Sequence, residues 1–303
     1  MAIPFVRDFD FEYGKVEQVS PLIRRVIANN PGPFTFTGTG VYIIGHGEVA
    51  VVDPGPYLED HFEALKAALE GETVKYVLIS HGHADHSPLA KPLADWAGCK
   101  VYAKGCGEPT AKGVISGEEH TEFEPDICIV EGDVFEGPGW TLEVIETPGH
   151  TTNHTCFDLK EENACLSGDH IMGWSTTIVA PPDGNMADYF RSLDKVEARN
   201  FETLWPAHGA PIQGKDFVKE FIQAYRQHRQ DREDGIIMQM RAGVTSIPEM
   251  VKAMYIGLED RLFPAACMSL MGHMVKLIEE GRVVSDDANP VVQSEFKLAK
   301  VEA

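Results

Sequence analysis

Short blocks of apolar and polar positions alternate along most of the chain, and their spacing predicts strands and helices in turn. Two β-branched runs around a His-Gly turn predict a hairpin, and apolar residues at helical spacing predict a helix after it. The first predicted elements are a hairpin at 41–53, a helix at 57–69, a strand at 74–80, a helix at 88–97 and a strand at 100–105. Further strands are predicted at 127–130, 141–146, 154–159, 164–167 and 203–206. The segment 104–126, rich in Gly, Glu and Pro, is predicted to be an irregular loop. Around His120 it is either a lid over the site or a solvated excursion, and the sequence does not separate the two.

From about Asp216 the pattern changes to helices. Three are predicted, at 216–243, 246–255 and 264–281, and a hairpin is predicted within 282–300. The first helix is expected to break near Gly235, and Ser246 is the expected N-cap of the second. We therefore expect two domains, residues 1–215 and residues 216–303. The second is mostly helical and winged-helix-like in size.

The repeated order of strand, polar loop and helix is typical of an α/β protein, in which helices pack on the faces of a sheet. Functional side chains in such folds gather on the loops at strand ends. The loops that follow the predicted strands are therefore where chemistry is expected.

The net charge of the chain disfavours some classes of binding partner. The chain carries 47 acidic and 26 basic residues, a formal net charge of −21. Residues 216–303 hold 14 acidic and 11 basic residues, so residues 1–215 carry about −18. Proteins that bind polyanions usually present a basic face, and this balance disfavours them. Because the sequence has neither a long apolar run nor the apolar core of a secretory signal, we expect no membrane span and a cytoplasmic location.

Candidate chemistry is concentrated in the segment SHGHADHS, directly after a predicted strand. It contains His81, His83, Asp85 and His86. Neutral imidazole and carboxylate groups are good ligands for zinc and related ions. Four such groups on so short a loop cannot all face one ion at tetrahedral angles. The spacing therefore favours two ions.

Three later turns each present one further candidate ligand. His150 follows a strand and a Pro-Gly turn, Asp169 follows a strand and a glycine, and His208 follows another strand. Each turn is built from small residues. The repetition favours a shared metal centre over incidental polar loops.

The HGHADH motif at 81–86, followed in order by His150, Asp169 and His208, resembles that of the metallo-β-lactamase-fold hydrolase superfamily. The sequence VVDPG at 51–55 resembles the early hairpin and turn of that superfamily. The match spans roughly residues 36–212. It implies a four-layered αββα sandwich, here with a C-terminal winged-helix-like domain.

The resemblance also implies a ligand set for two divalent ions. The first ion would be held by His81, His83 and His150, the second by Asp85, His86 and His208, with Asp169 bridging the two. Zinc is the expected metal, with iron or manganese as alternatives. Two ions about 3.5–4 Å apart share a water and supply a bridging hydroxide at neutral pH. Asp85 is implied as the catalytic residue that orients or receives the proton.

Asp169 separates branches of the superfamily. The true β-lactamases of this fold lack a bridging aspartate at that turn, whereas the glyoxalase-II-like, lactonase and RNA-processing branches carry one. Residues 167–196, then LWPAHGAPI at 204–212 and the helical tail, resemble the β-lactamase-like protein 2 group. In that group a winged-helix-like domain follows the hydrolase.

The expected function is dinuclear metal-dependent hydrolysis of a small ester, thioester or lactone, because an acidic body disfavours polyanions. The branch resemblance implies an alternative, an endoribonuclease acting on single-stranded RNA. A β-lactamase ranks lower because of Asp169 and the missing secretory signal. A regulator with a vestigial hydrolase domain also ranks lower, since the ligand set is complete. The expected partner is a small-molecule substrate, and a homodimer is left as an open alternative.

Other polar and aromatic groups have ordinary interpretations. His154 and His170 are expected to be satisfied histidines rather than groups that support the ligands. Residues 189–193 have helical spacing that favours core packing over a pocket wall. The arginines within 226–232 are expected on a solvated helix face with internal ion pairs. The C-terminal domain is expected to pack, dimerise or cover a pocket rather than read DNA.

Overall fold

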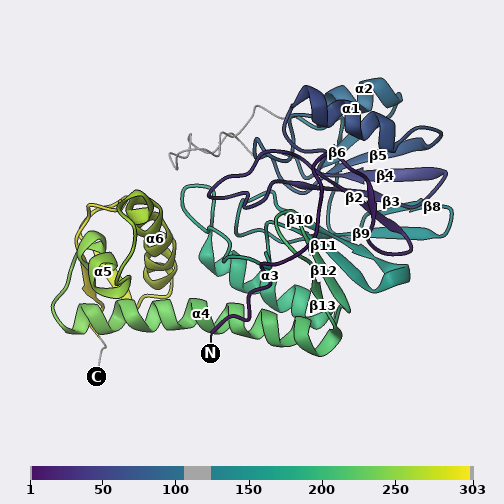
Figure 1. Cartoon of the computed structure of the whole chain (residues 1–303). Coiled ribbons are helices and arrows are strands. Elements are labelled where there is room, and N and C mark those ends of the chain that lie inside the picture. The colour runs from purple at the N-terminus through teal and green to yellow at the C-terminus, as the bar shows by residue number, and fades with distance from the viewer. Residues whose placement is uncertain (1, 106–123, 301–303) are drawn as a thin grey trace.

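The computed structural model describes residues 2–105 and 124–300. Within these ranges, two large β-sheets lie face to face and helices cover both outer faces, which gives four layers (Figure 1). This is the αββα sandwich that the resemblance implied. Most of the predicted loop at 104–126, including His120, lies outside the described residues, so its proposed role as a lid stays a prediction.

The first sheet begins with antiparallel strands and continues with parallel ones. Its strands, in spatial order, are β1 (Glu17–Gln18), β2 (Ile23–Ile27), β3 (Gly40–Ile44), β4 (Glu48–Val52), β5 (Thr73–Ile79), β6 (Lys100–Ala103) and β7 (Ile127–Cys128). The predicted hairpin at 41–53 is confirmed as β3 and β4. Strand β2 was not predicted, because two adjacent arginines interrupt its apolar run. Helices α1 (Glu59–Ala68) and α2 (Ala90–Ala97) are the crossover connections that the parallel strands need.

The second sheet is antiparallel except for one pair. Its strands, in spatial order, are β13 (Ile212–Gln213), β12 (Thr203–Pro206), β11 (Ala164–Gly168), β10 (Thr155–Leu159), β9 (Trp140–Glu146) and β8 (Val134–Gly137). Strands β11 and β12 are parallel, and the chain between them contains helix α3 (Met186–Ala198). Asn185 caps α3 by accepting a hydrogen bond from the backbone N–H of Asp188 at 2.9 Å. The strands predicted at 141–146, 154–159, 164–167 and 203–206 are confirmed.

Apolar side chains form a layer between each pair of neighbouring elements. Tyr42, Trp140 and Phe157 belong to the layer between the sheets. Leu65 and Leu93 bring α1 and α2 onto the first sheet. The second sheet is covered by α3 and by the first half of helix α4 (Lys215–Arg241), through residues that include Tyr189, Leu193, Phe221 and Tyr225. The prediction that residues 189–193 serve core packing is confirmed at Tyr189 and Leu193, which are fully buried.

Helix α4 is continuous from Lys215 to Arg241, so the predicted break near Gly235 is wrong. A Cβ added at Gly235 would lie 2.7 Å from Cε of Met254. The distance is short because α4 packs closely against helix α5 (Ile247–Met254) at this point. The glycine therefore marks a close approach rather than a break. Because α4 packs on the sandwich at its start and on α5 and α6 (Phe263–Glu279) at its end, the boundary after residue 215 stays a prediction.

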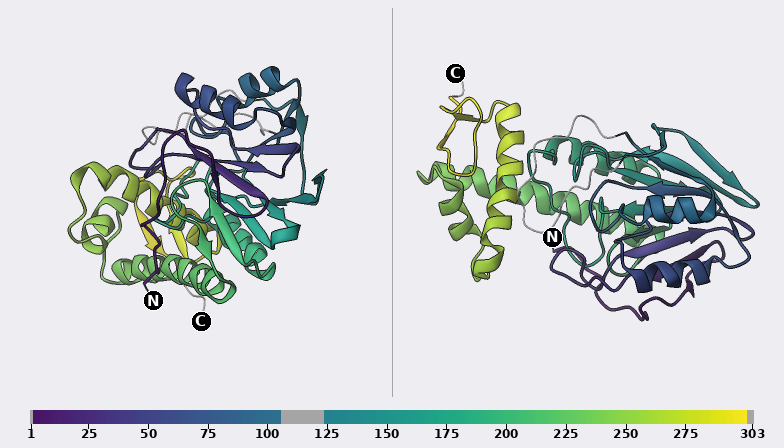
Figure 2. Two further views of the ribbon diagram at one scale, coloured as in Figure 1. Left: turned by 45° about the vertical axis from the view of Figure 1, so that its right-hand side comes forward. Right: turned by 90° about the horizontal axis from the view of Figure 1, so that it is seen from above.

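The end of α4, with α5, α6 and a terminal hairpin, forms a second packing unit that we name the C-terminal unit. Figure 2 shows it beside the sandwich, joined to it along α4. The hairpin consists of β14 (Val283–Ser285) and β15 (Phe296–Leu298), which confirms the predicted terminal hairpin. Short 3-10 helices occur at Lys160–Glu162 and Asp260–Leu262. None of the described helices is both long and apolar enough to cross a membrane.

Two helical glycines give a test of this packing. A Cβ at Gly272 of α6 would lie 2.4 Å from the backbone oxygen of Val179, which cannot move away cheaply. We expect Gly272→Ala to lower the free energy of unfolding by about 1–3 kcal/mol, although alanine is the better helix former. Urea unfolding followed by circular dichroism measures the change.

Gly235→Ala is the matched control, because its new methyl group meets only the flexible end of Met254. Better helix propensity should then stabilise the protein by up to about 1 kcal/mol. A Gly272→Ala protein as stable as the wild type would contradict the close contact of α6 with the sandwich.

Candidate metal centre

The predicted ligands all follow strands whose ends meet at one edge of the sandwich. Strand β5 leads directly into the loop at 81–86, and β9, β11 and β12 lead to His150, Asp169 and His208. Six of these seven side chains are buried, and Asp85 is partly exposed. The structure therefore brings together every residue that the sequence singled out.

Glycine is required beside one of these ligands for a steric reason. Gly149 has a φ of +142°, and a Cβ there would lie 2.5 Å from Cα of Tyr189 in helix α3. The absence of a side chain lets the turn after β9 pass close to α3. His150 is thereby carried to the edge where the other ligands lie.

The first group of ligand atoms comes from His81, His83 and His150. Nδ1 of His83 lies 2.8 Å from Nε2 of His81 and 3.1 Å from Nε2 of His150. Three imidazole nitrogens this close together, on buried side chains, can converge on a single ion.

The second group consists of Asp85, His86 and His208. Oδ2 of Asp85 lies 3.0 Å from Nε2 of His208 and 3.4 Å from Nε2 of His86. This mixed nitrogen and oxygen set fits zinc, iron or manganese.

Asp169 lies between the two groups. Its Oδ2 is 3.8 Å from Nε2 of His150, which belongs to the first group. Its Oδ1 is 3.4 Å from Nε2 of His208 and 3.6 Å from Nε2 of His86, which belong to the second. One carboxylate facing both groups with different oxygens has the geometry that a bridging ligand needs.

Three atoms at the middle of the cluster make only the ion-pair contacts given above and form no hydrogen bond of normal geometry with any described residue. They are Nε2 of His86, Oδ1 of Asp169 and Nε2 of His208, and all three are buried. Burial of an unpaired polar atom costs free energy, and natural proteins rarely tolerate several in one place. Coordination of divalent ions would satisfy all three, so the residues present fit such ions.

The pKa values within the cluster also favour bound divalent ions. Burial would raise the pKa of Asp169, but His208 and His86 hold that pKa well below its usual range. Burial would lower the pKa of His208, but Asp169 and Asp85 raise it to about 10. Without a cation, the carboxylates therefore depend on protonated imidazoles for compensation. Divalent ions can take over that role when they displace these protons.

The ligand imidazoles are oriented through their other ring nitrogens. Nδ1 of His150 lies 2.7 Å from the backbone oxygen of Ile178, and Nδ1 of His208 lies 3.2 Å from that of Gly38. A hydrogen bond at one ring nitrogen fixes the tautomer and leaves the other nitrogen free to coordinate. In both rings it is Nε2 that faces the cluster.

Asp53 is a functional residue that the sequence analysis did not identify. It directly follows β4 in the left-handed region, with φ of +49°. Its carboxylate accepts hydrogen bonds from N–H and Oγ–H of Ser80 at 2.7 and 2.6 Å. Its Oδ2 also lies 3.0 Å from Nδ1 of His86. Its place in VVDPG was the available signal, but nothing in the sequence shows that the end of β4 meets the end of β5.

The expectation for His154 is wrong, and that for His170 holds only in part: His170 supports no candidate ligand, but both of its ring nitrogens are buried without a hydrogen-bond partner among the described residues. Nε2 of His154 accepts a hydrogen bond from the backbone N–H of Asp169 at 3.1 Å, and Nδ1 lies 2.8 Å from Oγ1 of Thr147. His154 therefore positions the proposed bridging ligand. The His170 ring packs against Tyr189 with centroids 5.0 Å apart, and burial lowers its pKa to about 3.

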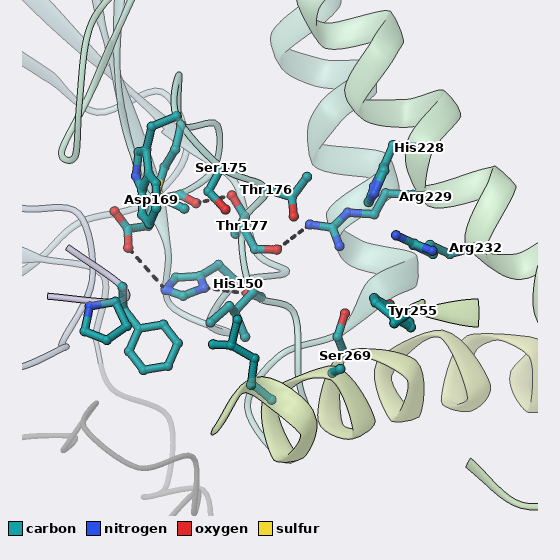
Figure 3. A pocket seen from close by; sticks show the side chains of 18 of the residues that line it. His150, Asp169, Ser175, Thr176, Thr177, His228, Arg229, Arg232, Tyr255 and Ser269 are labelled. Atoms are coloured by element: carbon teal, nitrogen blue, oxygen red, sulfur yellow. Dashed lines mark hydrogen bonds and ion pairs between the residues drawn. The ribbon is translucent and has the colours of Figure 1, made fainter. Parts of the chain in front are cut away.

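A cavity of about 390 Å³ opens on His150 and Asp169 and extends between the sandwich and the C-terminal unit (Figure 3). Its far end is lined by His228, Arg229 and Arg232 of helix α4. The expectation that this part of α4 is a solvated face is wrong at Arg229, which is only 2% exposed. Spacing along α4 could not reveal this, because the opposite wall comes from distant segments.

Comparison with known proteins agrees with this architecture. Residues 35–208 match the family model described as Metallo-beta-lactamase superfamily, and residues 246–289 match the model described as Beta-lactamase associated winged helix domain. The solved structure of a Beta-lactamase domain protein from Burkholderia ambifaria superposes on this chain with a TM-score of 0.79. The two are 22% identical in sequence, and the match covers 96% of each chain. That likeness shows the fold.

Two curated relatives are similar in sequence. A Beta-lactamase-like protein 2 homolog from Caenorhabditis elegans is 33% identical over 73% of this chain and 72% of its own. An Atrochrysone carboxyl ACP thioesterase from Cryptosporiopsis sp. is 32% identical over 71% of this chain and 63% of its own. Because the superfamily model matches more than half of this chain, the chain belongs to the metallo-β-lactamase superfamily of hydrolases, and it carries the winged-helix domain associated with that superfamily.

Proposed function

We propose that the protein is a dinuclear metal-dependent hydrolase that acts on a small ester, thioester or lactone. The observation that carries the proposal is the cluster of seven imidazole and carboxylate side chains with three unpaired, buried atoms at its centre. The relative from Cryptosporiopsis is named a thioesterase, which supports a thioester as the first candidate among these substrates.

The residues divide the work as follows. His81, His83 and His150 would hold one ion, Asp85, His86 and His208 the other, and Asp169 would bridge. When bound, such a pair of ions activates water at neutral pH and polarises the carbonyl oxygen under attack. His150 and Asp169 line the cavity, so an acyl group lying in it would reach the centre.

Asp85 is proposed as the residue that takes the proton of the attacking water. It is the one member of the set of seven that is partly exposed, so water can reach its carboxyl group. Interaction with His86 and His208 keeps its pKa well below the usual range, against the effect of burial. The group is therefore ionised and able to accept a hydrogen bond at neutral pH.

The substrate class is tested first by a panel on metal-analysed protein. We expect turnover of N-acetylcysteamine thioesters, p-nitrophenyl esters or δ-lactones, and much slower turnover of the β-lactam nitrocefin. No observation in the described residues favours the endoribonuclease alternative. The panel includes single-stranded RNA at low salt in order to test that alternative. RNA cleavage without hydrolysis of any acyl substrate would overturn the proposed class.

Removal of the metal or of the proposed bridging ligand should abolish this activity. We expect about two ions per chain by elemental analysis, loss of hydrolysis with a chelator and recovery when zinc is returned. Asp169→Ala should lower both the metal content and kcat/KM, the latter by roughly a hundredfold or more.

His46→Ala is the matched control for that variant, because His46 lies exposed on a turn. It should retain the metal content and activity of the wild type. An Asp169→Ala enzyme with undiminished turnover of every substrate would show that the cluster is not the catalytic centre.

Asp53 should act through His86 and through Ser80, whose Oγ lies 3.0 Å from Nδ1 of His81. Removing its carboxylate in Asp53→Ala leaves the His86 ring without an orienting partner, and we expect metal affinity to fall by about 10- to 100-fold. Competition with a chromogenic chelator measures the change. Asp95→Ala, which removes an exposed carboxylate on α2, should leave the affinity unchanged, and equal losses in both variants would argue against the orienting role.

A further inference from the structure

The cavity has two chemically different ends. His150 and Asp169 lie at the end toward the metal centre, and His228, Arg229 and Arg232 lie at the end toward α4 (Figure 3). Trp174, Ile178 and Leu258 are among the side chains along its walls. A molecule that fills the cavity therefore meets hydrolytic chemistry at one end and basic side chains at the other.

Three arginines at intervals of three residues along α4 have different environments. Arg226 forms ion pairs with Asp194 and Glu197 of helix α3, so its charge is compensated. Arg229 and Arg232 have no carboxylate within ion-pair distance among the described residues. The uncompensated pair is the one that lines the cavity.

Arg229 is a buried cation. It donates a hydrogen bond to the backbone oxygen of Thr177 and lies over the Tyr189 ring, 5.2 Å from the centroid. Its Nε has no hydrogen-bond partner among the described residues. A buried guanidinium that contacts only a carbonyl oxygen and an aromatic ring lacks the anion that normally offsets the free-energy cost of its desolvation.

Arg232 is held in place by an aromatic ring. Its guanidinium stacks on Tyr255, 4.2 Å from the ring centroid, and its Nε is also buried without a partner in the part of the chain that the structure describes. Stacking fixes the plane of the fork while leaving its edge free for hydrogen bonds. The planar fork matches the two oxygens of a carboxylate or a phosphate.

His228 adds a neutral polar group to the same end. Its Nδ1 is buried and unpaired among the described residues, and burial together with Arg229 and Arg232 lowers its pKa to about 4. The imidazole is therefore uncharged at neutral pH. It can donate or accept one hydrogen bond beside the two cations.

We infer that Arg229 and Arg232 form a subsite for an oxyanion, a carboxylate or phosphate group that the substrate carries at a distance from its scissile bond. The local positive charge stands out in a chain with a net charge of −21. A small anion can be held there, whereas the acidic surface disfavours extended polyanions. The catalytic consequence rests on the proposed hydrolysis, but binding of the oxyanion does not.

The first test compares charged and neutral substrates of matched shape. One pair is glutaryl-N-acetylcysteamine and its uncharged terminal amide, which places a carboxylate on the acyl side. The other pair is butyryl-4′-phosphopantetheine and butyryl-pantetheine, which places a phosphate on the thiol side. We expect kcat/KM to be at least about tenfold higher for the anionic member of one pair, and the pair that responds identifies the source of the oxyanion.

Arg232→Gln should remove most of that preference, lowering kcat/KM by about 10- to 100-fold for the anionic substrate and much less for its neutral partner. Arg232→Lys keeps the charge without the fork and should restore part of it. Arg241→Gln is the control, because Arg241 lies exposed at the end of the same helix and does not line the cavity. Unfolding temperatures establish that each variant is folded.

A binding measurement separates this inference from the proposed hydrolysis. Calorimetric titration of the metal-loaded protein with glutarate and with 4′-phosphopantetheine should show binding of at least one that weakens about tenfold or more in Arg232→Gln and not in Arg241→Gln. If no thioester, ester or lactone is hydrolysed, the proposed function fails, while this titration still decides whether the subsite exists. The oxyanion subsite is overturned if kcat/KM is equal for the charged and neutral members of both substrate pairs. It is also overturned if binding of glutarate and 4′-phosphopantetheine does not depend on Arg232.

Discussion

The candidate metal centre depends on hydrogen bonds that join the two sheets at one edge. The backbone N–H of Thr155, at the start of β10, donates to the backbone oxygen of Ser80 at 2.8 Å. At the other side, Gly40 N–H donates to the backbone oxygen of Ala207 at 2.7 Å. These bonds hold the loops before His81 and His208 against the facing sheet. Together with the apolar layer between the sheets, they bring candidate ligands from both sheets to one edge.

Buried polar groups extend this constraint outward from the ligands. Asp53 joins the ends of β4 and β5, and His154 joins the turn after β9 to the backbone of Asp169. Each contact fixes a ligand through a neighbouring element rather than through its own strand. The centre is therefore preorganised by the sandwich, which is what ligand positions accurate to fractions of an ångström require.

The C-terminal unit completes the site in a different way. Helix α4 starts on the sandwich and ends in the C-terminal unit, and it carries Arg229 and Arg232 to the cavity on its way. The close approach of Gly272 to Val179 brings α6 against the same region. Helix α4 thereby supplies charge, and residues of the segment 246–289 that matches the winged-helix model supply walls, to a cavity whose other end lies at the candidate metal centre of the sandwich.

The sequence by itself determined the α/β class, most of the strands and all seven candidate ligands, because strand ends, small-residue turns and clustered histidines are local patterns. It could not determine which groups support the ligands: Asp53 and His154 have this role only because distant strands end beside them. It misjudged Gly235 and Arg229 for the same reason, since a helix contacted by α5 or facing a cavity has the same local sequence as an exposed one. Only tertiary packing, which decides where unpaired charge and space remain, shows that α4 contributes to the site.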